Sequence, residues 1–288
     1  MPQRPVQAIT AAHRQLEGGG FMVRRPFPSQ GLEHFDPLLL LDEMGPTVYG
    51  PGEAVGAPDH PHRGFETVTY ILDGEGEHAD SAGHAGTIGP GDVQWMTAGA
   101  GVVHREMPSA RIQRDGGRVH GFQLWVNLPK AAKLSPPRYQ ELKADAIPEV
   151  RRDGVRVRVI AGEALGEAAA VRTHTAITYL HAVLEPGAEV ELAVPASHRV
   201  GVYVFEGSVV VGGEPVADGR FARLGDGDRL TLRSSGGGQC LVLGGEPLDE
   251  PIAWHGPFVM NTREELVQAV RDYQAGRLGR IPPEIVKA

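Results

Sequence analysis

The chain has 288 residues and a formal net charge of −8, without any run of basic residues. Its length allows one large domain or two domains of ordinary size, and its acidic balance argues against direct binding of nucleic acid. No stretch approaches the ~20 apolar residues that span a bilayer, so the sequence predicts no membrane-embedded segment.

The first residues and the single cysteine indicate a cytoplasmic protein. The opening stretch MPQRPVQAITAAHRQLEGGG has no apolar core behind a basic start, so we expect no secretory signal. Cys240 is the single cysteine and has no partner for a disulfide within the chain. We expect it to be a small buried residue.

Short apolar runs separated by turns predict a β-rich protein. The 39 glycines and 23 prolines punctuate these runs along the whole chain, as is typical of many short strands. The stretch NLPKAAKLSPPRYQEL interrupts this rhythm and indicates a connection between two strand arrays. We therefore expect an N-terminal domain over residues 1–130, a linker over 131–142 and a C-terminal domain over 143–288.

The two strand arrays resemble each other. TYILDGEG at 69–76 is similar to VYVFEGSV at 202–209, and IGPGDVQWM farther along is similar to LGDGDRLTL. These matches predict two copies of one β-unit, with a chance likeness between glycine-rich strands as the alternative.

The segment MNTREELVQAVRDYQAGRLG predicts a helix near the end of the chain. Thr262 and Glu265 fit a capping box, in which each side chain pairs with a backbone N–H of the first turn. Gly276 or Gly279 provides an end. Apolar residues recur on one face, and we expect them to pack on a barrel rather than bind a partner: Leu266, Ala269, Val270 and Tyr273.

Two pairs of candidate metal ligands have the spacing of neighbours on one face of a strand. His60 and His62 form the first pair, and His104 and Glu106 form the second. If their strands face each other, three imidazoles and one carboxylate converge, and burying them without a cation is costly. This donor set suits iron, manganese, nickel, copper, cobalt or zinc better than alkaline-earth ions. A lone strand histidine is more often a core or surface residue.

The runs HPHRGFETVTYIL, GHAGTIGPGDVQWMTAGAGVVHREMP, GFQLWVNLP and PFVMNTREELVQAVRDYQAGRLG resemble the pirin family of bicupins. The resemblance implies an all-β fold of two tandem jelly-roll β-barrel cupin domains in one chain with a C-terminal α-helix. It also implies a single iron in the N-terminal barrel. The family's ligand pattern falls on His60, His62, His104 and Glu106, and no ligand is missing.

The resemblance further implies an enzyme like quercetin 2,3-dioxygenase, which opens a flavonol ring with dioxygen and releases carbon monoxide. Fe(II) is the expected metal, and no other cofactor is expected. Glu106 would be a ligand and also the catalytic base. The partners would be a flavonol-like small molecule and dioxygen, and the protein a monomer. The alternative is a non-catalytic, redox-responsive iron protein that binds a regulatory protein partner; a sugar isomerase or storage cupin is a third.

The second strand array departs from the ligand pattern. The repeat aligns His60 and His62 with Ala193 and Pro195, and it aligns His104 and Glu106 with Cys240 and Val242. We therefore expect a metal-free second barrel.

Other residues near the ligand-bearing runs are weaker candidates. The aromatic and apolar residues Phe65, Trp95, Met96 and Trp125 could line a pocket, although core packing is the more common use. His78 and His84 lie in a glycine-rich stretch, so we expect both to be exposed. His120 could hold a ligand in place.

Overall fold

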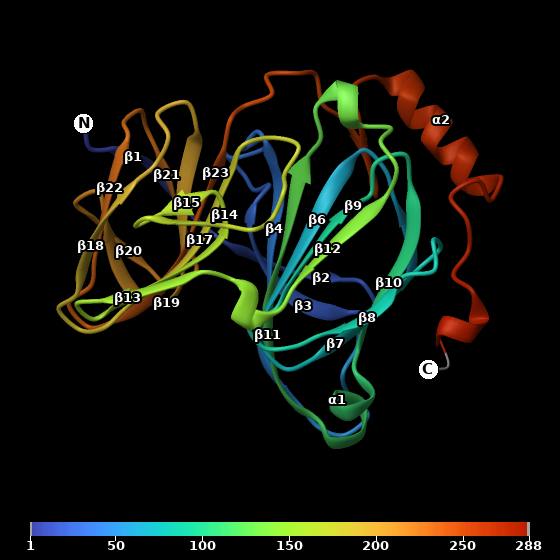
Figure 1. The fold of residues 1–288 in the computed structure, drawn as a ribbon, viewed down its shortest axis with the longest axis horizontal. Coiled ribbons are helices and arrows are strands. Elements are labelled where there is room, and N and C mark those ends of the chain that lie inside the picture. Colours follow the sequence, from blue (N-terminus) through green and yellow to red (C-terminus); the bar gives the residue numbers. More distant parts are fainter. Residues whose placement is uncertain (1, 287–288) are drawn as a thin grey trace. The chain divides into compact units, whose positions relative to one another are not determined.

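The computed structural model describes residues 2–286 (Figure 1). The chain forms two compact units, each assembled from three segments. Unit 1 comprises Met1–His13, Arg25–Leu39 and Asp145–Leu248, and unit 2 comprises Arg14–Arg24, Leu40–Ala144 and Asp249–Ala288. The C-terminal segment thus belongs to the unit that contains the first strand array, although the sequence analysis assigned it to the second domain.

Unit 2 contains two antiparallel sheets that position the candidate site. One sheet has the order β12-β9-β6-β11-β4-β3-β2, and the other has the order β5-β10-β7-β8. Their strands are β2 (His13–Glu17), β3 (Phe21–Phe27), β4 (Leu38–Tyr49), β5 (Ala57–His62), β6 (Phe65–Asp73), β7 (Gly76–Asp80), β8 (Ala85–Ile88), β9 (Val93–Thr97), β10 (Val102–Pro108), β11 (Gly117–Asn127) and β12 (Arg138–Leu142).

Side-chain hydrogen bonds join the inner faces of these two sheets. Thr69 on β6 donates to Glu106 on β10, and Gln123 on β11 donates to the same carboxylate. Successive strand residues point to opposite faces, so the inward set in both sheets recurs every second residue. The interior of unit 2 is therefore lined from both sides by this alternating set, as in a jelly roll.

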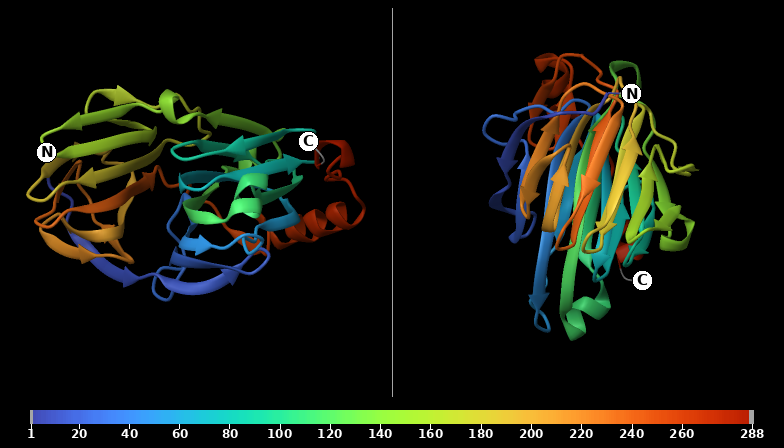
Figure 2. Two further views of the ribbon diagram at one scale, coloured as in Figure 1. Left: turned by 90° about the horizontal axis from the view of Figure 1, so that it is seen from below. Right: turned by 90° about the vertical axis from the view of Figure 1, so that its left-hand side faces the viewer.

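The closing segment packs on unit 2. A hairpin of β24 (Ala253–His255) and β25 (Phe258–Met260) precedes α2 (Arg263–Gln274), drawn in red in Figures 1 and 2. The capping box of Thr262 and Glu265 is confirmed. Ala269 is fully buried in a cluster with Phe258 and Val103, and the partly buried Leu266 and Val270 pack against this cluster. Tyr273 lies at the edge and is 41% exposed.

Unit 1 contains a ten-stranded sheet whose main order is β1-β21-β19-β23-β17-β14-β13, while β18 pairs β22 and β20 pairs β19. Its strands are β1 (Val6–Ala11), β13 (Glu149–Arg152), β14 (Val155–Ala161), β17 (Ile177–Leu184), β18 (Glu189–Ala193), β19 (Arg199–Val211), β20 (Glu214–Ala217), β21 (Arg220–Leu224), β22 (Arg229–Arg233) and β23 (Gly238–Gly245). The remaining short elements of the chain are β15 (Glu163–Ala164), β16 (Glu167–Ala168), α1 (Ala110–Asp115) and the 3-10 turns Lys130–Ala132, Ala144–Ala146 and Pro283–Val286.

The interior of unit 1 is an apolar core. Cys240 and Val242, which align with His104 and Glu106 in the internal repeat, both lie in this core and are fully buried. Burial raises the pKa of the Cys240 thiol to about 12, so the group is a packed neutral thiol as expected. Within residues 2–286 no helix is long and apolar enough to cross a bilayer.

Candidate metal centre

Strands β5 and β10 bring three of the predicted ligands together. The two strands are antiparallel, with His60 opposite His104 and His62 opposite Val102. Directly opposite residues share one face of a sheet, so all three imidazoles point to the interior of unit 2. A register shift follows His104 and places Glu106 opposite Ala57.

The three imidazoles form a compact cluster. One ring nitrogen from each of His60, His62 and His104 lies within 4.8 Å of the other two. The Nε2 atoms of His60 and His62 are 3.1 Å apart, and Nδ1 of His60 lies 2.7 Å from the carbonyl oxygen of Pro58. Because that carbonyl only accepts, Nδ1 of His60 carries the hydrogen and its Nε2 presents a lone pair to the cluster.

Burial keeps the inner two rings neutral. Desolvation, followed by the charges of His104 and His60, lowers the pKa of His62 well below its usual value. The pKa of His104 is lowered in the same way by burial first, then by His60 and His78. Both residues are therefore neutral at physiological pH and have lone pairs available.

The ring nitrogens of His104 lack a protein partner. In the part of the chain that the structure describes, neither of them makes a hydrogen bond. Buried polar atoms are nearly always paired, and an unpaired one costs about 1–3 kcal/mol. Three imidazoles whose nitrogens converge fit a divalent transition metal, which would act as the partner that His104 lacks.

Glu106 is held beside this cluster by two hydrogen bonds. Its Oε1 accepts a hydrogen bond from the Thr69 hydroxyl (2.9 Å), and its Oε2 accepts one from the Gln123 amide (2.8 Å). The indole of Trp125 donates to Oε1 of Gln123 (3.2 Å), which fixes the orientation of that amide. The potential metal-ligating atoms that lie close together come from the three histidines. The role of Glu106 as a ligand and base stays a prediction.

An aromatic wall adjoins His62. Trp125 and Phe65 lie 5.1 Å and 5.0 Å from its ring, and Trp254 of β24 lies 5.8 Å from Trp125. Trp125 and Trp254 are both partly exposed, and Phe65 packs against Trp125 with ring centroids 4.2 Å apart. Trp254 was not predicted from the sequence, because nothing in its local pattern places it beside Trp125, 129 positions earlier. Trp95 and Met96 are fully buried and belong to the core.

The remaining histidines differ from expectation in part. His78 was predicted to be exposed, and this is wrong: it lies on β7 and is 4% exposed. His84 has a half-exposed side chain and pairs with Asp80. His120 is buried and contacts Glu43, which also binds Arg24, so this histidine supports a separate ion pair.

The turn after the first ligand pair has a fixed conformation. Gly64 has a φ of +90°, and a Cβ at this position would lie 1.9 Å from the carbonyl oxygen of Val259. Arg63 donates to the carbonyl of Ala100 (2.6 Å) and to Asp272 of α2 (2.8 Å). The hydrogen bond from Arg63 lowers the pKa of Asp272 to about 2, so α2 is tied to the ligand-bearing turn.

Lys133 also holds this turn in place through buried hydrogen bonds. It is 2% exposed, and its ammonium donates to the carbonyls of Gly64 (2.8 Å) and Val259 (3.0 Å) and to the Asn127 side chain (2.7 Å). We expect Lys133→Met to lower the free energy of unfolding at neutral pH by about 3 kcal/mol, because three buried acceptors lose their donor. Urea denaturation measures the loss.

The same substitution has a characteristic pH dependence. Burial lowers the pKa of Lys133 from 10.5 to about 8. Between these values the unfolded chain binds more protons, so the Lys133 contribution to stability rises with pH by about 1.4 kcal/mol per unit. The stability gap between the wild type and Lys133→Met should therefore widen from pH 8 to 10. Parallel pH profiles would contradict this account.

The chain is similar in sequence to known proteins along most of its length. Residues 20–126 match the family model described as Pirin, and residues 179–279 match the Pirin C-terminal cupin domain. Human pirin is 42% identical over 283 residues, covering 96% of this chain and 94% of that protein. A Pseudomonas aeruginosa protein provisionally named quercetin 2,3-dioxygenase is 46% identical over 275 residues, covering 93% of this chain and 96% of that protein.

A solved structure is similar over almost the entire chain. The crystal structure of quercetin 2,3-dioxygenase from Acinetobacter baumannii is 39% identical, has a TM-score of 0.92, and covers 98% of this chain and 100% of that chain. The predicted all-β fold with two cupin domains and a C-terminal helix is therefore confirmed. The chain belongs to the pirin family.

Proposed function

We propose that this protein is a metal-dependent dioxygenase that opens the ring of a flavonol and releases carbon monoxide. The observation that carries the proposal is the cluster of three imidazoles from His60, His62 and His104, in which neither ring nitrogen of the buried His104 has a partner among the described residues. The name quercetin 2,3-dioxygenase borne by the similar Acinetobacter protein supports the choice of substrate. Fe(II) is the proposed metal, with Mn, Ni, Cu, Zn and Co as alternatives.

His60, His62 and His104 would hold the metal, with Glu106 as a fourth ligand. A bound divalent metal supplies a Lewis acid that lowers the pKa of an enolic hydroxyl, together with an electron path to dioxygen. Imidazole ligands would add no charge to the metal, so a single carboxylate would leave the site net positive and suited to an anionic oxygen ligand.

Glu106 is the group placed to take up the enolic proton. Its two oxygens each accept one hydrogen bond, from Thr69 and Gln123, and each keeps a further lone pair. A carboxylate held in this way could accept a proton from the substrate. Trp125 and Trp254 would stack on the flat ring system of the substrate and exclude water from one side.

Oxygen uptake with quercetin tests the proposal. Protein loaded with Fe(II) is expected to consume dioxygen in equal amount to quercetin and to release the same amount of carbon monoxide. Oxygen uptake without release of carbon monoxide would show that the protein carries out another oxidation and does not open the ring in this way. An absence of quercetin-dependent uptake with each candidate metal would favour the alternative, a redox-responsive module that binds a regulatory protein.

A further inference from the structure

A row of polar side chains crosses the inner face of the larger sheet of unit 2. Glu141 on β12 is opposite Gln94 on β9, Gln94 is opposite Thr69 on β6, and Thr69 is opposite Gln123 on β11. Opposite residues share a face, and Thr69 and Gln123 contact Glu106 across the interior. All four polar side chains therefore lie on the inner face of this sheet, toward Glu106; the region between the inner faces of the two sheets is called the chamber below.

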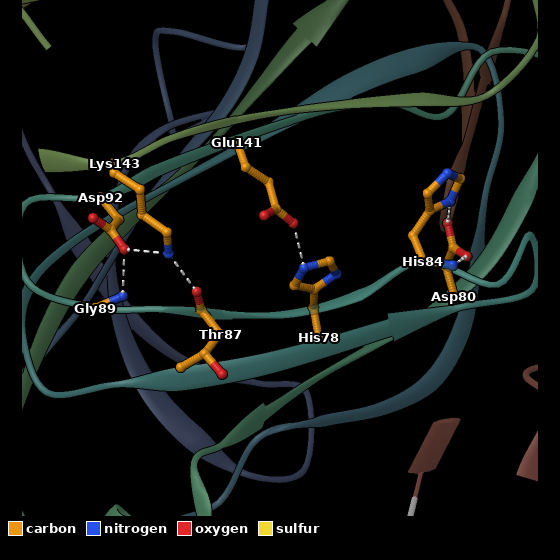
Figure 3. A network of polar contacts seen from close by, with 8 residues as sticks. All are labelled: His78, Asp80, His84, Thr87, Gly89, Asp92, Glu141 and Lys143. Carbon is orange, nitrogen blue, oxygen red and sulfur yellow. Dashed lines mark hydrogen bonds and ion pairs between the residues drawn. The ribbon is translucent and has the colours of Figure 1, made fainter. Parts of the chain in front are cut away.

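His78 faces this row from the other sheet. It lies on β7 directly opposite Glu106 of β10, and its Nε2 is 2.9 Å from Oε1 of Glu141 (Figure 3). An ionised carboxylate only accepts, so Nε2–H donates to Glu141 and the lone pair of a neutral ring is left at Nδ1. That Nδ1 is buried and makes no hydrogen bond to the described residues. His78 thus presents an unused acceptor inside unit 2.

The ring of His78 is held in a fixed orientation. Tyr139 of β12 stacks on it with ring centroids 5.3 Å apart and planes inclined by 24°. On the neighbouring strand β8, a Cβ at Gly86 would lie 2.8 Å from Nε2 of His78 and 3.0 Å from Oε1 of Glu141. A glycine at this position thus leaves room for the hydrogen-bonded pair. A partnerless acceptor in a rigid ring is pre-organised for a ligand.

We propose that His78 binds a hydroxyl group of the substrate, with Nδ1 accepting its hydrogen bond and Glu141 acting as the positioning residue. The inference rests on the proposed function, because it concerns the same chamber. It narrows the substrate to planar aromatic compounds that carry, besides the enolic hydroxyl for the metal, a second phenolic hydroxyl. The amide of Gln94, in the same polar row, adds hydrogen-bonding capacity at that end of the chamber.

His78 is close enough to the candidate metal centre for one substrate molecule to contact both. His78 and Glu106 lie directly opposite each other on adjacent strands. Strands in a sheet are about 4.8 Å apart, so one small polyphenol is large enough to reach both groups.

Equilibrium binding of two ligands tests the inference. Quercetin carries additional phenolic hydroxyls, whereas the parent flavonol has the enolic hydroxyl and no other. In metal-loaded protein, His78→Phe keeps an aromatic ring against Tyr139 and is expected to weaken quercetin binding about 10-fold, the value of one neutral hydrogen bond. Flavonol binding should change less than about 2-fold, as it lacks the group that His78 would hold.

Two further variants separate binding from folding. Glu141→Gln alters a side chain that is 43% exposed, and it should weaken quercetin binding selectively but less than His78→Phe. His84→Phe is the matched control, because His84 lies against the same tyrosine (ring centroids 5.1 Å apart) and should leave both affinities unchanged. Metal content and the thermal midpoint are measured alongside.

Each outcome decides the inference independently of turnover. A selective loss of quercetin affinity in His78→Phe and Glu141→Gln supports it. Equal losses for both ligands, or no loss for either, would overturn it, as would a wild type that binds neither ligand. If the wild type binds quercetin but opens no ring, the proposed function fails while the binding ratios still decide the role of His78.

Discussion

His104→Ala is expected to remove the metal from the protein and to abolish quercetin-dependent oxygen uptake. His104 is 1% exposed, and neither of its ring nitrogens has a protein partner, so in the apo protein its polar atoms contribute little that alanine would lose. In the metal-bound protein the same change deletes one of three nitrogen donors. Altering a group that only supports a ligand costs about 10–100-fold in metal affinity, so deleting the ligand should cost more.

Elemental analysis and oxygen uptake of the purified variant measure both effects. His255→Ala is the control, because His255 is an exposed histidine on β24 of the same unit. The control should keep the metal and the activity of the wild type. A His104→Ala protein that is folded and keeps its full metal content would contradict the assignment of this residue.

Glu106→Gln is expected to lower the turnover of quercetin by about 100-fold to 10,000-fold, the usual effect of a general base. The amide is the same size, and its oxygen can still accept from Gln123 while its NH2 group donates to the Thr69 hydroxyl, which can also accept. The hydrogen bond from Trp125 to Gln123 is then kept. The change thus removes the proton acceptor and leaves the residues that orient it in place.

Steady-state kinetics together with metal analysis separate the two roles of Glu106. Loss of turnover with full metal content indicates a base, and loss of both indicates a ligand as well. Glu264→Gln, at an exposed position of α2, serves as the control and should behave as the wild type. Unchanged kcat and KM in Glu106→Gln would remove this residue from the mechanism.

The local parts of the fold and site are those that the sequence predicts. The spacing of His60 and His62 sets both rings on one face of a strand whatever else the chain does. The capping box at Thr262 and Glu265 likewise depends only on residues three positions apart. Both features follow from neighbours in the sequence, which is why they can be recognised without a structure.

The parts that depend on distant pairing could not be predicted. The contact of Trp254 with Trp125 requires the closing hairpin to pack on unit 2, and no local pattern encodes this. The burial of His78 depends on its pairing with β10 and on Glu141 of β12, whereas the glycine-rich stretch around it resembles an exposed turn. A strand of five residues gives too short an alternation to outweigh that composition.

We propose that His60, His62 and His104 together hold one metal ion on which the activity depends. The most direct test strips the protein with a chelator and measures quercetin-dependent oxygen uptake as Fe(II) is added back. We predict no uptake in the stripped protein and a linear rise that stops at one equivalent of metal per chain. Undiminished uptake without metal, or a rise that continues to two equivalents, would contradict the account.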